Sequence, residues 1–214
     1  MREITATAAR LVVEEGLDYA SAKRRAKKQL GAPPRSRLPD NDLLESEVRA
    51  HIELFCADTQ PAELQALREL ALRWMQRLAV FRKYLSGAVW NGTATRLSDI
   101  HLQLFCDDPK SAEITLLDRG VRFQVRPVNG FNGETVDALS FSSPCPELGE
   151  AIGIHLTIHD HDALRGALKP GADGQPRRGD IHALSARMAE PEVFLGVTSG
   201  REQKTLCLSG QALA

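Results

Sequence analysis

The hydrophobic pattern of this chain changes period near residue 86, and that change limits what the chain can fold into. Before this point apolar residues recur every three or four positions, as on one face of an α-helix. Beyond it they alternate with polar residues, as in half-buried β-strands. We therefore expect an α+β protein, in which an N-terminal helical region precedes a small mixed β-sheet with flanking helices.

Four amphipathic segments before residue 86 predict helices. Asp18 stands at the N-cap position of the second segment, and Asp40 or Asn41 at that of the third, where a side-chain oxygen accepts free backbone N–H groups. Three prolines in residues 32–39 lack backbone donors and indicate an extended linker. The last segment carries the longest apolar stripe. The expected helices are residues 4–16, 18–31, 40–57 and 61–85.

Strands are expected after residue 86, with short helices between them. Residues 99–105 alternate most cleanly, with Ile and Leu on one face and His101 and Gln103 on the other. Residues 151–159 repeat this pattern, because glycine, threonine and two histidines alternate there with Ile and Leu. The expected strands are residues 88–91, 99–105, 121–125, 136–141 and 151–159, and the expected helices are residues 107–120, residues 160–168 and a segment that Asp180 caps.

The order of these elements predicts four regions along the chain. A proline-rich linker ends the first region, and the change of period ends the second. A Gly, Pro and Arg-rich stretch follows the third. The expected regions are a basic helical hairpin with its linker (1–37), a helical region (38–86), an α/β core (87–168), and a linker with a weakly structured C-terminal tail (169–214).

Composition excludes several classes of protein. The 27 Lys and Arg residues nearly balance 28 Asp and Glu residues, so a basic surface must be local. Neither a membrane-spanning apolar run nor a secretory signal is visible, so we expect a cytoplasmic protein without a membrane partner. The four cysteines form no close pair, which favours buried free thiols over a redox or zinc motif. The sequence also lacks the GxxxxGK[ST] phosphate loop and the GxGxxG dinucleotide motif.

Residues 90–102, WNGTATRLSDIHL, resemble the signature of a known superfamily. They place a Gly–Thr turn before Ser-Asp-Ile-His-Leu on a strand, as in the polymerase-β-type nucleotidyltransferases. The chain is identified as a divergent bacterial member with a degenerate motif, over roughly residues 86–168. The resemblance implies metal-dependent transfer of a nucleoside monophosphate from an NTP to a hydroxyl of a protein, an RNA or a small molecule.

The superfamily pattern also assigns roles to individual residues. Its members carry a Gly-Ser turn, two acids at positions i and i+2 of the next strand, and a third acid on a later strand. Such acids share a sheet face and hold divalent metals. Histidines replace two of the acids here, and histidine suits zinc or manganese better than magnesium. By resemblance, Gly92, Thr93 and Ser98 bind nucleotide, Asp99 is catalytic, and Asp99, His101 and His155 hold a divalent metal (Mg, Mn or Zn).

Other interpretations of the same residues remain open. The strand at 99–105 would also suit a half-solvated edge with a polar outer face. The chain could instead be a non-catalytic nucleotide- or nucleic-acid-binding module, or use the apolar helix 61–85 as a protein-interaction surface. The His-rich stretch 155–162 suits either a metal site or a solvated strand end.

A basic segment near the N-terminus suggests a contact with RNA or DNA. Residues 1–37 hold nine Lys or Arg residues against four acids. A basic helix can follow the phosphates of a nucleic acid, although a solvated helix face gives the same pattern. The candidate contacts are Lys23, Arg24, Arg25, Lys27 and Lys28.

Overall fold

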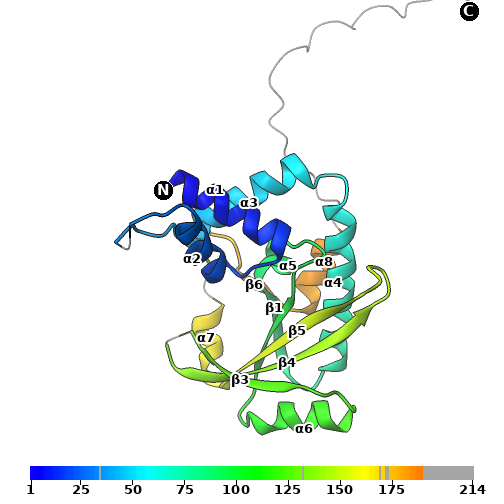
Figure 1. Ribbon diagram of the computed structural model, residues 1–214. Helices are drawn as coiled ribbons and strands as arrows, with labels where there is room; N and C mark the ends of the chain where they lie inside the picture. Colours follow the sequence, from blue (N-terminus) through cyan, green and yellow to red (C-terminus); the bar gives the residue numbers. More distant parts are fainter. Residues whose placement is uncertain (34, 132, 169, 172–173, 190–214) are drawn as a thin grey trace, which may run out of the picture.

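The structure is a computed structural model that describes residues 1–33, 35–131, 133–168, 170–171 and 174–189 (Figure 1). A mixed six-stranded sheet, with the strand order β3-β4-β5-β2-β1-β6, is combined with helices that precede, flank and follow it. This arrangement confirms the expected α+β class. No helix in the described part of the chain is long and apolar enough to span a membrane.

The first three helices pack on one another and have a core of their own. Asp18 caps the second by accepting the Ser21 N–H at 3.0 Å, and Asp40 caps the third by accepting the Leu43 N–H at 2.7 Å. Both caps confirm the helix starts expected from the sequence. The helices are α1 (Arg2–Glu15), α2 (Tyr19–Gln29) and α3 (Asn41–Phe55).

The segment from residue 60 to residue 91 differs from its prediction. The helix expected to reach residue 85 ends eight residues earlier, and a strand follows. That strand pairs antiparallel with β2, and its Leu85 lies opposite Leu102. The pairing between strands therefore overrides the helical spacing of the apolar residues in this segment. The strand expected at residues 88–91 is helical instead. The observed elements are α4 (Gln60–Arg77), β1 (Arg82–Ser86) and α5 (Gly87–Asn91).

The centre of the sheet is the parallel pair of β2 and β5, and all other neighbouring strands are antiparallel. The register places His101 beside His155, and Ser140 of β4 on the other side of His155. The strand expected at residues 121–125 begins three residues later. The remaining strands are β2 (Ile100–Phe105), β3 (Gln124–Asn129), β4 (Thr135–Cys145), β5 (Glu150–His159) and β6 (Arg178–Gly179).

The two faces of the sheet have different environments. Alternate residues such as Ile100, Leu102 and Leu104 are buried against α4, α6 (Lys110–Asp118) and α8 (Ile181–Ala189). Figure 1 shows α4 and α8 together on one side of the strands. The opposite side, which we call the open face, carries His101, Gln103, Ser140, His155, Thr157 and His159. After β5 come the short helices η1 (His161–Ala163) and α7 (Leu164–Ala167).

The hydrophobic cores group the elements differently from the four expected regions. Helix α3 packs with α1 and α2, whereas α4 and β1 share the core of the sheet. Strand β6 and helix α8 also join the sheet, although residues 169–214 are expected to be a linker and a tail. Residues 190–214 lie outside the described part of the chain. The segment after residue 174 is therefore part of the folded core as far as residue 189.

The expectation of four buried free thiols is met in part among the described residues. Cys56, Cys106 and Cys145 are all free. Cys145 is buried, whereas Cys56 and Cys106 are half-buried. Cys207 lies outside the described residues.

Candidate functional site

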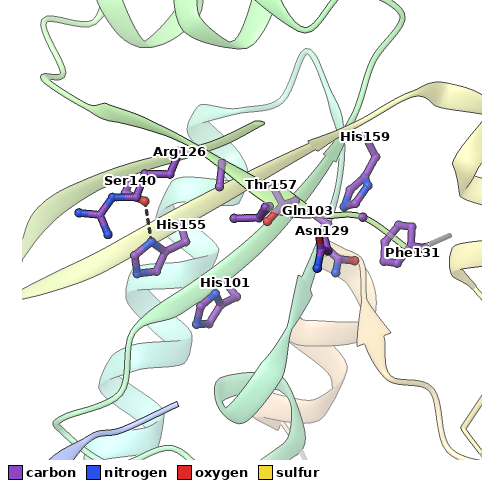
Figure 2. Close-up of a pocket in the computed structure, with 12 residues that line it drawn as sticks. His101, Gln103, Arg126, Asn129, Phe131, Ser140, His155, Thr157 and His159 are labelled. Carbon is purple, nitrogen blue, oxygen red and sulfur yellow. Dashed lines mark hydrogen bonds between the residues drawn. The ribbon is translucent and has the colours of Figure 1, made fainter. Parts of the chain in front are cut away.

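A chain of hydrogen bonds joins three residues of the open face. His155 Nδ1 lies 2.8 Å from Ser140 Oγ (Figure 2). His155 Nε2 lies 3.0 Å from Asp99 Oδ2. A neutral imidazole satisfies both contacts, because Nε2–H donates to the carboxylate and Nδ1 accepts the Ser140 O–H. The hydrogen bond from His155 lowers the pKa of Asp99, so this carboxylate is ionised at neutral pH. Both nitrogens of His155 are thus engaged within the protein.

Gly153 makes room for the Asp99 carboxylate. It lies on β5, two residues before His155, and its backbone N–H also donates to Asp99. A Cβ atom at position 153 would overlap Asp99 Oδ1. A glycine is therefore required on β5 at the point where the carboxylate crosses it.

His101 lies beside His155 on the neighbouring strand, and their rings stack with centroids 5.0 Å apart and an interplanar angle of 21°. Desolvation by the surrounding protein lowers the pKa of His101. The positive charge of a protonated His155 lowers it further. His101 is still accessible to solvent on its open side. It is therefore a neutral hydrogen-bonding group at pH 7.

The predicted metal ligands share one face, but the structure does not arrange them as a metal site, and their binding of a metal stays a prediction. His155 would have to give up Asp99 or Ser140 in order to bind one, and the His101 ring is nearly parallel to the His155 ring. Within the described residues, no group of three or more His, Cys, Asp or Glu side chains is arranged to hold a metal. In the His-rich stretch, Asp160 caps η1 by accepting the Asp162 N–H at 2.8 Å.

The residues of the predicted nucleotide-binding turn make contacts of their own within the protein. The Gly92 carbonyl accepts a hydrogen bond from Gln60 Nε2 at 3.1 Å, which ties the turn to α4. Thr93 is buried, and Ser98 Oγ accepts the Thr95 N–H at 3.0 Å. Gly92 and Ser98 therefore have structural contacts, and the contact of Gly92, Thr93 and Ser98 with a nucleotide stays a prediction.

Gly87, which the sequence did not single out, also lies next to the open face. It begins α5 immediately after β1 and has a φ of +72°. A Cβ at this position would lie 3.5 Å from His101 Cδ2. Its sequence signal is a glycine directly after a strand, but that signal is hidden when β1 is interpreted as the end of a helix.

A hollow of about 410 Å³ lies over the open face (Figure 2). His101 and His155 lie at one end of it, and His159 and Phe131 lie at the other. This volume falls within the range of small-molecule sites. The other polar groups in its lining are Gln103, Arg126, Asn129, Ser140 and Thr157.

The far end of the hollow is aromatic. Phe131, in the connection between β3 and β4, stacks on His159 with centroids 4.1 Å apart and an interplanar angle of 15°. Phe105 packs against the same histidine at 5.4 Å. The guanidinium of Arg178 on β6 lies over the Phe131 ring, 4.5 Å from its centroid. The sequence did not single out Phe131 or Arg178, because non-local pairing brings them together.

Two of the predicted nucleic-acid contacts hold the proline-rich linker. Lys23 Nζ donates to the Pro39 carbonyl at 3.0 Å and to Asn41 Oδ1 at 2.8 Å. Lys27 Nζ donates to the Ser36 carbonyl at 2.9 Å. Lys23 and Lys27 therefore stabilise the path of the linker along α2.

The other cations of α2 lie on its exposed surface. Arg25 pairs with Glu15, and Arg24 donates to Ser21 Oγ at 3.1 Å. Lys28 is exposed. A contact between α2 and RNA or DNA stays a prediction, and Arg24 and Lys28 are the residues most available for it.

Comparison with known proteins gives only distant structural similarities. No protein-family description and no curated protein matches the chain. Two structures of the Cid1 poly(U) polymerase, a mutant bound to MgATP and a complex with MgGTP, align with TM-scores of 0.35 and 0.34. Each is 13% identical over 51% of this chain, which spans only 38% of the polymerase. A cytoplasmic RNA terminal U-transferase aligns with a TM-score of 0.28, also at 13% identity, over 56% of this chain and 32% of the transferase. Similarities at this level do not decide what the chain does.

Proposed function

We propose that this chain is a nucleotide-binding module that holds its ligand on the open face without carrying out metal-dependent transfer. The observation that carries the proposal is the lining of the 410 Å³ hollow. It combines a guanidinium, imidazoles, amides, hydroxyls and a phenyl ring, and its His155 is already bonded to the Asp99 carboxylate.

The lining matches the two chemically different parts of a nucleotide. Arg126 can donate to phosphate oxygens, and charge-assisted hydrogen bonds of this kind are the strong ones. The hydroxyls of Ser140 and Thr157 and the amides of Gln103 and Asn129 can bond to sugar and base groups. The His159 ring at the far end can stack with a base.

The hydrogen-bonded chain of Asp99, His155 and Ser140 does not support a hydrolase. A serine nucleophile needs backbone N–H groups that point at the developing oxyanion. Ser140 lies within β4, which pairs with β3 on one side and β5 on the other, so the neighbouring N–H groups belong to the two ladders. These hydrogen bonds therefore fix the orientation of His155 on the floor of the hollow.

Replacing Arg126 is expected to weaken nucleotide binding. Arg126→Gln removes the guanidinium from the hollow, and loss of one exposed charge-assisted bond corresponds to about tenfold in Kd. The expected measurement is isothermal titration of ATP, GTP, CTP and UTP in EDTA and again in magnesium. Affinity in EDTA should be retained, because the proposed contacts to the nucleotide are side-chain contacts that need no metal.

Arg119→Gln is the matched control. Arg119 is exposed at the C-terminal end of α6 and does not line the hollow, so its replacement should leave Kd unchanged. Equal losses in both variants would mean that the site is wrong. Absence of binding to any of the four NTPs at millimolar concentration would overturn the proposed function.

A further inference from the structure

His159 is a buried histidine whose ring nitrogens are not used by the fold. Its exposed fraction is 2%, and neither Nδ1 nor Nε2 has a hydrogen-bond partner among the described residues. Burial lowers its pKa, and so does the nearby charge of Arg178. An unpaired buried polar group destabilises a fold, so one that persists needs an explanation.

Arg178, at the same end of the hollow, also has a buried nitrogen without a hydrogen-bond partner among the described residues. Its Nη1 donates to Gln103 Oε1, but its buried Nε has no partner among the described residues. Phe131 contacts both His159 and Arg178 and offers neither of them a polar atom. The Phe131 ring therefore lies between the face of the His159 imidazole and the Arg178 guanidinium.

Of the two phenyl rings on His159, Phe131 is the one able to leave. Phe105 is 2% exposed and belongs to the central strand β2, whereas Phe131 is 36% exposed and lies in the connection between β3 and β4. A ligand could reach His159 along the hollow only if a covering group moves, because its nitrogens have no exposed area. Displacement of Phe131 exposes one face of the His159 ring without disturbing the sheet.

We infer that the space now filled by the Phe131 ring is a subsite for the base of a nucleotide. This inference rests on the proposed function. A heteroaromatic ring there would replace the stacking on His159 and the contact with the Arg178 guanidinium. The sugar attached to such a base reaches beyond the stacked ring, toward the edge of the imidazole where the unsatisfied His159 nitrogens point, which Phe131 cannot do. The Phe131 ring therefore occupies the subsite when no ligand is bound, and it competes with the ligand for this space.

The competition predicts the direction of a mutational effect. Phe131→Ala should tighten the binding of ATP, GTP, CTP or UTP about three- to tenfold, the range that the loss of one competing aromatic contact gives. Inorganic triphosphate has no base, so its affinity should not change. In the parent protein, NTPs but not triphosphate should shift the NMR signals of the His159 ring nitrogens.

Two further variants serve as a control and as an alternative to Phe131→Ala. Phe55→Ala removes an exposed phenylalanine of α3 that does not line the hollow, and it should leave all affinities unchanged. Phe131→Leu keeps an apolar side chain without the stacked ring, so it should tighten NTP binding to a smaller extent than Phe131→Ala. It replaces Phe131→Ala in the test if that variant does not fold. Weaker or equal NTP binding by the Phe131 variants, with binding by the parent intact, would overturn the subsite and leave the proposed function standing. Absence of NTP binding in every variant and in the parent would overturn both.

Discussion

In magnesium, the chain is expected to transfer no label from α-labelled NTPs to itself, to RNA or to a cell lysate. Two-metal phosphoryl transfer needs oxygen ligands that hold both ions. Asp99 is already bonded to His155, and histidines stand where the resemblance places the second and third acids. Loss of about 4–7 kcal/mol of transition-state stabilisation slows such a reaction about 10³- to 10⁵-fold.

The assay compares the parent with Asp99→Asn in magnesium, manganese and zinc. Asp118→Asn, at the exposed end of α6, serves as the control for the loss of a carboxylate. All three proteins should stay at background. Magnesium-dependent labelling that Asp99→Asn abolishes would contradict this account, and so would labelling in manganese or zinc alone, because a metal site would then have to assemble around His101 and His155.

Gly179→Ala is expected to lower the free energy of unfolding by about 3 kcal/mol. Gly179 is buried on β6, and a Cβ there would overlap the ring of Trp90. That ring is 2% exposed and is fixed because Trp90 Nε1 donates to the Pro176 carbonyl at 2.7 Å. Arg187 also lies over it, 4.0 Å from the ring centroid. Because a fixed ring cannot move aside, overpacking will strain the junction of β6, α5 and α8.

Thermal unfolding measures this effect, which corresponds to about 6–12 °C in Tm for a chain of this length. The matched variant is Gly166→Ala in α7, where an added Cβ meets no atom of the described chain within 4 Å. Alanine is favoured over glycine in a helix, so this change should be neutral or slightly stabilising. Equal Tm values for the two variants would show that β6 does not pack as described.

Local signals predicted most of the elements, because caps and periodicity act over a few residues. The carboxylates of Asp18 and Asp40 mark helix starts that the structure confirms. The error at β1 has a physical cause. Leu85 continues the helical spacing of α4, and only its pairing with Leu102 on β2 makes the segment a strand. A short apolar run such as residues 87–91 does not distinguish helix from strand by itself.

The candidate site was partly visible in the sequence. Alternation placed His101 and His155 on polar strand faces, and the parallel pairing of β2 with β5 places them side by side. The partner of His155 on β4 was not visible, because it depends on a register between strands that the sequence does not encode locally. Phe131 and Arg178 come from a hairpin connection and from the opposite edge of the sheet, so they could not be linked before the structure was known.

The most direct measurement of the central claim is where a nucleotide binds. NMR spectra of the labelled chain would be recorded during titration with an NTP in EDTA, following backbone amides and imidazole nitrogens. We predict that the largest shifts fall on His101, His155 and Thr157 of the open face, while the amides of α6 on the other face stay unchanged. Shifts confined to α2 or α6, or no shifts at millimolar nucleotide, would contradict the claim that the open face is a nucleotide site.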